Sequence, residues 1–147
     1  MTNRFTQKAQ NALNHALIAA RSFGHSYVGS EHLLVGLASD GESVSARILA
    51  AKGVTRAKII DTITTAIGTG TPTDVTAADL TPRVKQIIEM SAYTSTRLGH
   101  SYIGTEHLLL SLLEESDCVA LRVLEALGVG ANELKNSLLS YFDGAAR

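Results

Sequence analysis

Two short stretches of this sequence place a threonine and a cation where a helix should begin. Thr6 precedes Lys8, and 75 residues later Thr81 precedes Arg83. Threonine is a good helix N-cap, and the N–H groups of a first helical turn attract anions. A cation in that turn opposes the helix dipole, which is an unusual choice unless an anion is bound nearby. The pattern indicates a small anion site at each helix start, although a solvated basic side chain would give the same pattern.

A carboxylate recurs with the same spacing inside a repeated motif. Residues 24–34 read GHSYVGSEHLL and residues 99–109 read GHSYIGTEHLL, with nine of the eleven positions identical. A serine or threonine, expected as the N-cap of a second helix, directly precedes Glu31 and Glu106. Each carboxylate can serve the helix dipole alone, or it can bind a guanidinium through both oxygens. Beside an anion site, it would suit a ligand with one anionic and one cationic end.

The histidines of the motif offer a candidate metal site that their spacing does not favour. His25, Glu31 and His32 have ligand-type side chains, and metal-dependent hydrolysis is the enzyme alternative that they suggest. Glu31 and His32 are neighbours, so on a helix they point to different sides, unlike the i, i+4 histidines of HExxH. We interpret the histidines as capping or packing the turn, and we expect no metal and no cofactor.

Other catalytic signatures are missing from the sequence. It contains no GxSxG elbow and no Walker A motif, so it predicts neither an α/β-hydrolase nor a P-loop ATPase. Its one cysteine, Cys118, has Ser43 as its counterpart 75 residues earlier, so the repeat does not preserve a thiol. None of these three signatures therefore supports catalysis by this sequence.

The composition favours a helical protein that does not rely on a strongly charged surface. The chain has 147 residues, of which 45% are hydrophobic and 5% aromatic, with no tryptophan, which favours close-packed helices over a β-sandwich. The net charge of −1 argues against a nucleic-acid partner. No apolar run approaches the roughly 18 residues of a membrane span, and the N-terminus lacks a secretory signal. A single cysteine fits a cytoplasmic location.

The helical pattern is duplicated along with the motif. Apolar residues recur every three to four positions in both halves, and no stretch alternates as a strand would. The first helices are expected to follow Thr6 and Thr81 and to stop at Gly24 and Gly99, and the second helices to start at Ser30 and Thr105 with these residues as N-caps. Third helices are expected over about 43–52 and 117–127, and fourth helices over about 55–67 and around Leu134–Phe142.

Each half thus predicts a four-helix unit that would be only marginally stable alone. Residues 68–79, GTGTPTDVTAAD, have the composition of a linker. We expect one all-α domain over 1–147, in which repeat one (about 5–67) and repeat two (about 80–143) pack around a pseudo-two-fold axis.

Three motifs resemble a known family. Arg4-Phe5-Thr6-x-x-Ala9, Thr81-Pro82-Arg83 and the duplicated GHSY[VI]G[ST]EHLL resemble the Clp N-terminal repeat domain, and the sequence is most similar to the N-domains of ClpC-type AAA+ unfoldases. The resemblance implies a double four-helix module without catalysis of its own. It also implies recruitment of adaptor proteins and of substrates marked by phosphoarginine to a Clp ATPase ring.

The resemblance further implies where phosphoarginine binds. The two sites carry over to Thr6 with Glu31 in the first half and to Thr81 with Glu106 in the second. The threonines and first-turn N–H groups would hold phosphate, and the glutamates would hold the guanidinium. Arg4, Lys8, Arg83 and Lys85 are candidates to add positive charge. An alternative is a free-standing Clp-repeat protein that acts as an adaptor or decoy for a Clp ATPase.

Overall fold

The computed structural model describes residues 4–145, and within them every regular element is a helix. Residues 1–3 and 146–147 of the expected domain lie outside the described residues. The elements are α1 (Gln7–Phe23), α2 (Ser30–Ser39), α3 (Val44–Ala51), α4 (Arg56–Ala66), the 3-10 turn η1 (Ala77–Asp79), α5 (Pro82–Arg97), α6 (Thr105–Glu114), α7 (Val119–Ala126) and α8 (Ala131–Ala145). The prediction of an all-α fold with two four-helix repeats is confirmed.

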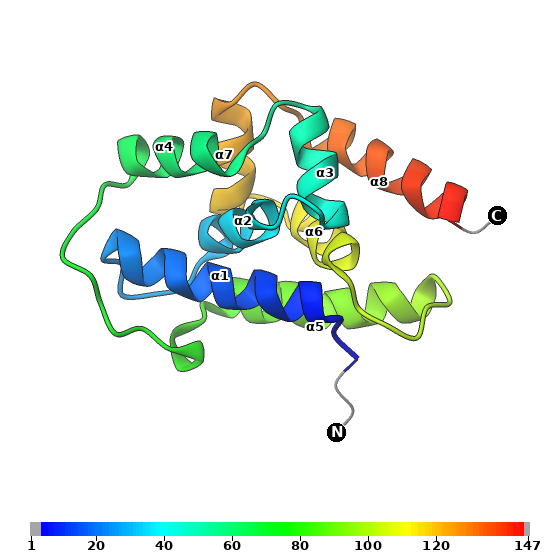
Figure 1. The fold of residues 1–147 in the computed structure, drawn as a ribbon, viewed down its shortest axis with the longest axis horizontal. Coiled ribbons are helices and arrows are strands. Elements are labelled where there is room, and N and C mark those ends of the chain that lie inside the picture. The colour runs from blue at the N-terminus through cyan, green and yellow to red at the C-terminus, as the bar shows by residue number, and fades with distance from the viewer. Residues whose placement is uncertain (1–3, 146–147) are drawn as a thin grey trace.

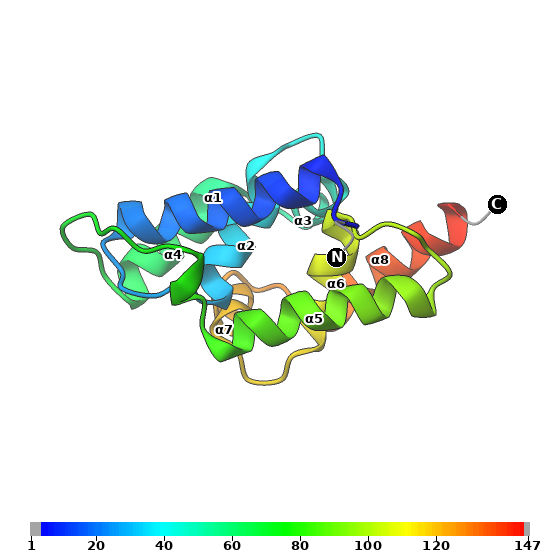
Figure 2. The same cartoon turned by 90° about the horizontal axis from the view of Figure 1, so that it is seen from below.

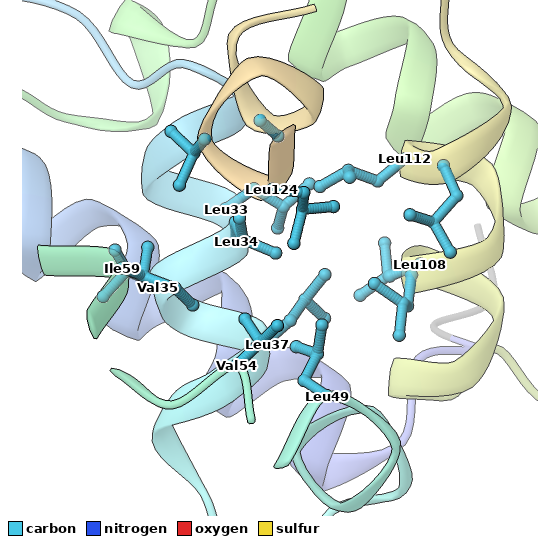
Figure 3. Close-up of a cluster of buried hydrophobic side chains, with 14 of the residues drawn as sticks. Leu33, Leu34, Val35, Leu37, Leu49, Val54, Ile59, Leu108, Leu112 and Leu124 are labelled. Carbon is cyan, nitrogen blue, oxygen red and sulfur yellow. The ribbon is translucent and has the colours of Figure 1, made fainter. Parts of the chain in front are cut away.

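The helices α2 and α6 form the centre of the molecule, as their almost continuous apolar sequences predict. Figure 3 shows leucines of α2 facing leucines of α6, with side chains from α3 and α7 closing the cluster. The helices α1 and α5 lie on the same side of this central pair and run along the two edges of that face (Figures 1 and 2). None of the described helices is both long and apolar enough to cross a membrane.

The first helices begin where the sequence predicts. The hydroxyl of Thr6 accepts a hydrogen bond from the N–H of Ala9 at 3.1 Å, and that of Thr81 accepts from Val84 at 3.2 Å. At the other end of α1, Gly24 adopts φ 77°, a left-handed conformation that terminates the helix.

The second helices start at the expected residues but with different caps. The N-cap residues are Gly29 and Gly104, not Ser30 and Thr105. In each copy the N–H of the glycine donates to Nδ1 of the histidine three residues later, at 2.8 Å to His32 in the first copy. Because the imidazole supplies this cap, the serine and threonine hydroxyls are released for another partner.

That partner is the opposite repeat. The hydroxyl of Ser30 accepts the N–H of Ala120 in α7 at 3.0 Å, and the hydroxyl of Thr105 accepts the N–H of Ser45 in α3 at 3.2 Å. The prediction that these hydroxyls cap their own helices is therefore wrong, because both are committed to the start of a third helix in the other repeat.

Short parallel bridges also cross between the repeats. Phe5 pairs with Ile103, and Val28 pairs with Leu80. The first bridge includes hydrogen bonds from the N–H of Thr6 to the carbonyl of Ile103 at 2.9 Å, and from Ile103 to Arg4 at 2.8 Å. The segment that precedes each first helix is thus held against the turn that precedes the second helix of the other repeat.

Candidate functional site

Two cavities of about 310 Å³ each occupy corresponding places in the duplicated fold, and we name them by their carboxylates. The Glu31 pocket is lined by Tyr27, Gly29, Ser30, Glu31, Thr81, Arg83, Asp117, Cys118 and Val119. The Glu106 pocket is lined by Thr6, Gln7, Lys8, Glu42, Val44, Arg47, Thr105 and Glu106.

Three helices begin at each pocket. The Glu31 pocket lies at the starts of α2, α5 and α7, and the Glu106 pocket at the starts of α6, α1 and α3. The first N–H groups of a helix have no partner within the helix, and the helix dipole places partial positive charge there. Helix starts that converge on one cavity can attract an anion.

The structure pairs the predicted residues differently from the sequence interpretation. Thr81 lies in the pocket of Glu31, and Thr6 lies in the pocket of Glu106, so the pairing of Thr6 with Glu31 within one repeat is wrong. The cause is the pair of inter-repeat bridges, which carry the start of each first helix to the other repeat. Each pocket therefore contains residues from both repeats.

Both carboxylates are buried in the pocket walls. Glu31 is 1% exposed and Glu106 is 6% exposed. The hydroxyl of Tyr27 donates to Glu31 at 3.0 Å, and burial together with this carboxylate raises the pKa of Tyr27 to about 12. Burial also raises the pKa of Glu106 above its ordinary value. A buried carboxylate is strongly stabilised by a cationic ligand, because water solvates it poorly.

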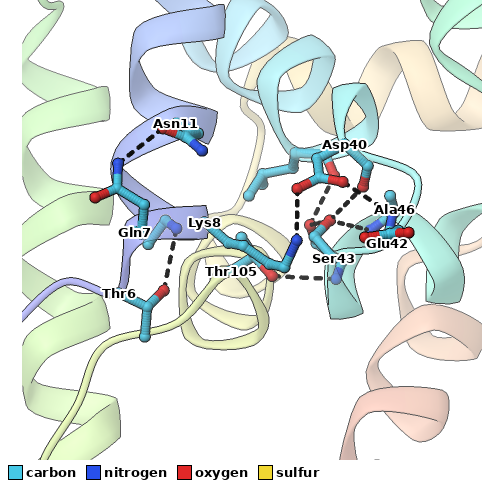
Figure 4. A network of polar contacts seen from close by, with 12 residues as sticks. Thr6, Gln7, Lys8, Asn11, Asp40, Glu42, Ser43, Ala46 and Thr105 are labelled. Carbon is cyan, nitrogen blue, oxygen red and sulfur yellow. Dashed lines mark hydrogen bonds and ion pairs between the residues drawn. The ribbon is translucent and has the colours of Figure 1, made fainter.

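The two cations of the first turns have acidic partners. Lys8 forms an ion pair with Asp40 at 2.9 Å, which Figure 4 shows beside Thr6 and Thr105. Arg83 forms the equivalent pair with Glu115 at 3.2 Å and donates to the carbonyl of Ser116 at 2.7 Å. Both cations line their pockets. Their ion pairs with Asp40 and Glu115 explain in part why a cation stands at each helix start.

The other two candidate cations lie elsewhere. Arg4 donates to the hydroxyl of Ser95 at 3.1 Å and to the carbonyl of His100 at 3.2 Å, so its guanidinium fastens the N-terminal segment to the second repeat. Lys85 is exposed one turn into α5 and lines neither pocket. The expectation that these two side chains add charge to the sites is not supported by their positions.

Paired histidines hold the turn before each carboxylate. Because the N–H of Gly29 donates to Nδ1 of His32, the proton of neutral His32 is on Nε2, which then donates to Nδ1 of His25 at 2.7 Å. His100 and His107 repeat this contact at 2.8 Å. Within residues 4–145, no three His, Cys, Asp or Glu side chains group as a metal site would require.

The buried histidines predict a loss of stability in acid. Burial and the neighbouring histidine lower the pKa of His32 to about 3 and of His107 to about 4, from 6.5. Between the lowered pKa values and 6.5, the unfolded chain binds protons that the folded chain does not. The free energy of unfolding therefore falls as the pH drops from about 7 towards 4.

In urea unfolding from pH 7.5 to 4.5, the free energy of unfolding of His32→Gln should depend less steeply on pH than that of the unaltered domain. The exposed His15 gives the control, and a His32→Gln slope equal to that of His15→Gln would contradict the prediction.

Residues 4–127 and again 79–145 match the model described as the Clp repeat (R) N-terminal domain. The chain belongs to the Clp repeat N-terminal domain family. The resemblance seen in the motifs is thereby confirmed, and the second match begins at the start of the second repeat.

Relatives of this Clp N-domain are much longer proteins. It is 42% identical over 139 residues to "Negative regulator of genetic competence ClpC/MecB" of Bacillus subtilis (strain 168), which covers 95% of the chain and 17% of that relative. It is 41% identical over 140 residues to "Chaperone protein ClpB" of Oceanobacillus iheyensis, again 95% of the chain and 17% of the relative.

Solved N-domains share the fold. The N-terminal domain of the caseinolytic protease associated chaperone ClpD from Arabidopsis thaliana superposes with a TM-score of 0.81 at 24% identity, over 95% of each chain. A ClpV N-domain in complex with a VipB peptide superposes with a TM-score of 0.68 at 15% identity, over 95% of this chain and 88% of that one.

The Clp N-domain also has pocket residues that the sequence interpretation missed. Arg47 lines the Glu106 pocket, and its guanidinium makes no hydrogen bond or ion pair with any residue between 4 and 145. Asp117 lines the Glu31 pocket and binds Arg122 at 2.8 Å. The sequence does mark these arginines, since Arg47 and Arg122 are 75 residues apart, which is the spacing of the repeat. Their place in a pocket depends on contacts between the repeats, which the spacing does not predict.

Proposed function

We propose that this domain recruits proteins marked by phosphoarginine, with one modified side chain bound in each pocket. The observation that carries the proposal is a buried carboxylate beside three converging helix N-termini, present twice. Phosphoarginine joins a phosphoryl group to a guanidinium, so its two ends match the two kinds of group in the pocket wall.

The phosphoryl group would lie at the helix starts. In the Glu106 pocket, Gln7 and Lys8 are the first two residues of α1, so their N–H groups have no partner within the helix. The hydroxyl of Thr6 accepts from Ala9 and can still donate its own proton to a phosphoryl oxygen. The Lys8 ammonium adds positive charge at the same edge.

The guanidinium would meet Glu31 or Glu106. A bidentate contact between a guanidinium and a carboxylate is among the stronger charge-assisted hydrogen bonds, and burial strengthens it further. Unmodified arginine lacks the anion that the helix starts attract, and phosphoserine lacks the cation that the carboxylate requires. The pocket should therefore discriminate against both.

The proposed recruitment serves a Clp ATPase. Relatives of this chain include ClpC and ClpB proteins, and the related ClpV N-domain is known in complex with a VipB peptide. We infer that this domain is non-catalytic and delivers adaptor proteins and marked substrates to an ATPase ring. The ring is either part of the same chain or a separate partner, and the parent reading frame distinguishes these two arrangements.

Calorimetric titration with free phosphoarginine tests the proposal. We expect two molecules to bind per chain, and the Glu31→Gln/Glu106→Gln variant to lose at least about 100-fold in affinity, because a charged contact is lost in both pockets. Arginine and inorganic phosphate serve as control ligands. The absence of heat at millimolar phosphoarginine, or equal affinity for arginine, would refute the proposed ligand.

A further inference from the structure

The two pockets differ at the helix starts, where the phosphoryl group would bind. In the Glu106 pocket the first residue of α1 is Gln7, which has an N–H to offer, whereas the equivalent residue of α5 is Pro82, which has none. Arg47 adds to the Glu106 pocket a guanidinium that has no hydrogen-bond or ion-pair partner among residues 4–145, while its counterpart Arg122 is bound to Asp117 at 2.8 Å. The Glu106 pocket thus has more donors and one more available cation.

The Glu106 pocket also continues into a second cavity. Val44 and Arg47 line both the pocket and an adjoining groove of about 260 Å³, which passes between α3 and α8. The rest of the groove is mainly apolar, with Ile48 and Ala51 on α3 and Tyr141 on α8. A chain bound with its modified arginine on Glu106 can therefore place a neighbouring residue in the groove.

One wall of the groove is aromatic, because Tyr141 of α8 lines it. Tyr141 is 36% exposed, and the charges of Glu106 and Arg47 both act on its hydroxyl. Tyr102 is likewise partly exposed and lies near Glu106 and Tyr141. Partly exposed aromatic rings beside an apolar groove suit an aliphatic or aromatic side chain of a bound peptide.

Beside the Glu31 pocket, the described residues have no counterpart of Tyr141. The residue 75 positions before Tyr141 is Ala66, the last residue of α4, so the corresponding helix has no aromatic side chain at that place. On the other side of the pocket, Asp117 and Arg122 are occupied with each other.

We propose that the Glu106 pocket is the site that recognises phosphoarginine within a peptide, and that the groove between α3 and α8 binds an apolar side chain next to the modified residue. The Glu31 pocket binds the modified side chain without regard to its neighbours. This inference rests on the proposed function, because it extends the same ligand along the peptide chain.

Two single variants isolate the pockets for the test. Glu31→Gln leaves only the Glu106 pocket intact, and Glu106→Gln leaves only the Glu31 pocket intact. Each is titrated with two pentapeptides that carry a central phosphoarginine, one flanked on both sides by leucine and one by glycine. We expect Glu31→Gln to prefer the leucine peptide by roughly fivefold or more, since part of an apolar side chain is buried. Glu106→Gln should bind the two peptides equally.

The groove itself is tested by adding Tyr141→Ala to Glu31→Gln. The ratio of the affinities for the leucine and glycine peptides should then fall close to one. Leu139→Ala is the matched control, because Leu139 is an exposed residue of the same helix that does not line the groove. Equal preference in the two single variants, or a preference that survives Tyr141→Ala, would overturn the inference while leaving phosphoarginine binding intact. Failure of the unaltered domain to bind free phosphoarginine would instead overturn the proposed function and this inference together.

Discussion

The double variant Thr6→Asp/Glu31→Gln should lose phosphoarginine binding almost completely, whereas Thr6→Asp/Glu106→Gln should retain one full site. The reason is that Thr6 belongs to the Glu106 pocket and not to the Glu31 pocket. The first variant damages both pockets, and the second damages one pocket twice. A carboxylate placed against the phosphoryl group costs several kcal/mol, so the first variant should bind at least about 100-fold more weakly.

The substitution at residue 6 is chosen to leave the fold intact. Aspartate is at least as good an N-cap as threonine, so α1 keeps its cap while the pocket gains a negative charge. The two double variants thus serve as controls for each other, and calorimetric stoichiometry is the measurement. If each site were instead built within one repeat, the two results would be exchanged, which would refute the inter-repeat pairing.

Replacement of Gly36 by alanine should destabilise the domain by about 3 kcal/mol, the upper part of the usual range for overpacking. A Cβ at this position would lie 2.1 Å from the carbonyl oxygen of Ala12, so α1 would have to move away from α2. That oxygen belongs to backbone and cannot be displaced by a change of rotamer. In thermal unfolding the midpoint should fall by roughly 10 °C for a domain of this size.

The second repeat supplies the matched control. Ser111 is equivalent to Gly36, is buried, and has a hydroxyl with no hydrogen-bond partner among the described residues. Ser111→Ala should therefore leave the stability unchanged or raise it slightly, because it removes an unsatisfied polar atom. Equal destabilisation by the two substitutions would contradict the close approach of α1 to α2.

Much of the fold could be predicted from the sequence because it depends on local rules. Helical periodicity, the N-caps Thr6 and Thr81, and the left-handed Gly24 are each decided within a few residues of the chain. The duplicated motif then required that the second half repeat the first. The buried position of α2 and α6 followed from their apolar sequences alone.

The caps of the second helices show where local reasoning fails. Ser30 and Thr105 are of the usual N-cap types, but a histidine three residues later takes that role in each copy. The freed hydroxyls bind the other repeat. A side chain can satisfy either a near or a distant N–H group, and the sequence does not record which one it meets.

The sequence by itself determined the helices, their duplication, and the residue types of the site: a threonine at a helix start and a glutamate in a first turn. Only the tertiary structure decided that Thr6 lines the same pocket as Glu106 and that Thr81 lines the same pocket as Glu31. The physical reason is that the bridges at Phe5–Ile103 and Val28–Leu80 join segments far apart in the chain. Such pairing depends on how whole repeats pack together, and packing also brought Arg47 and Tyr141 beside the Glu106 pocket.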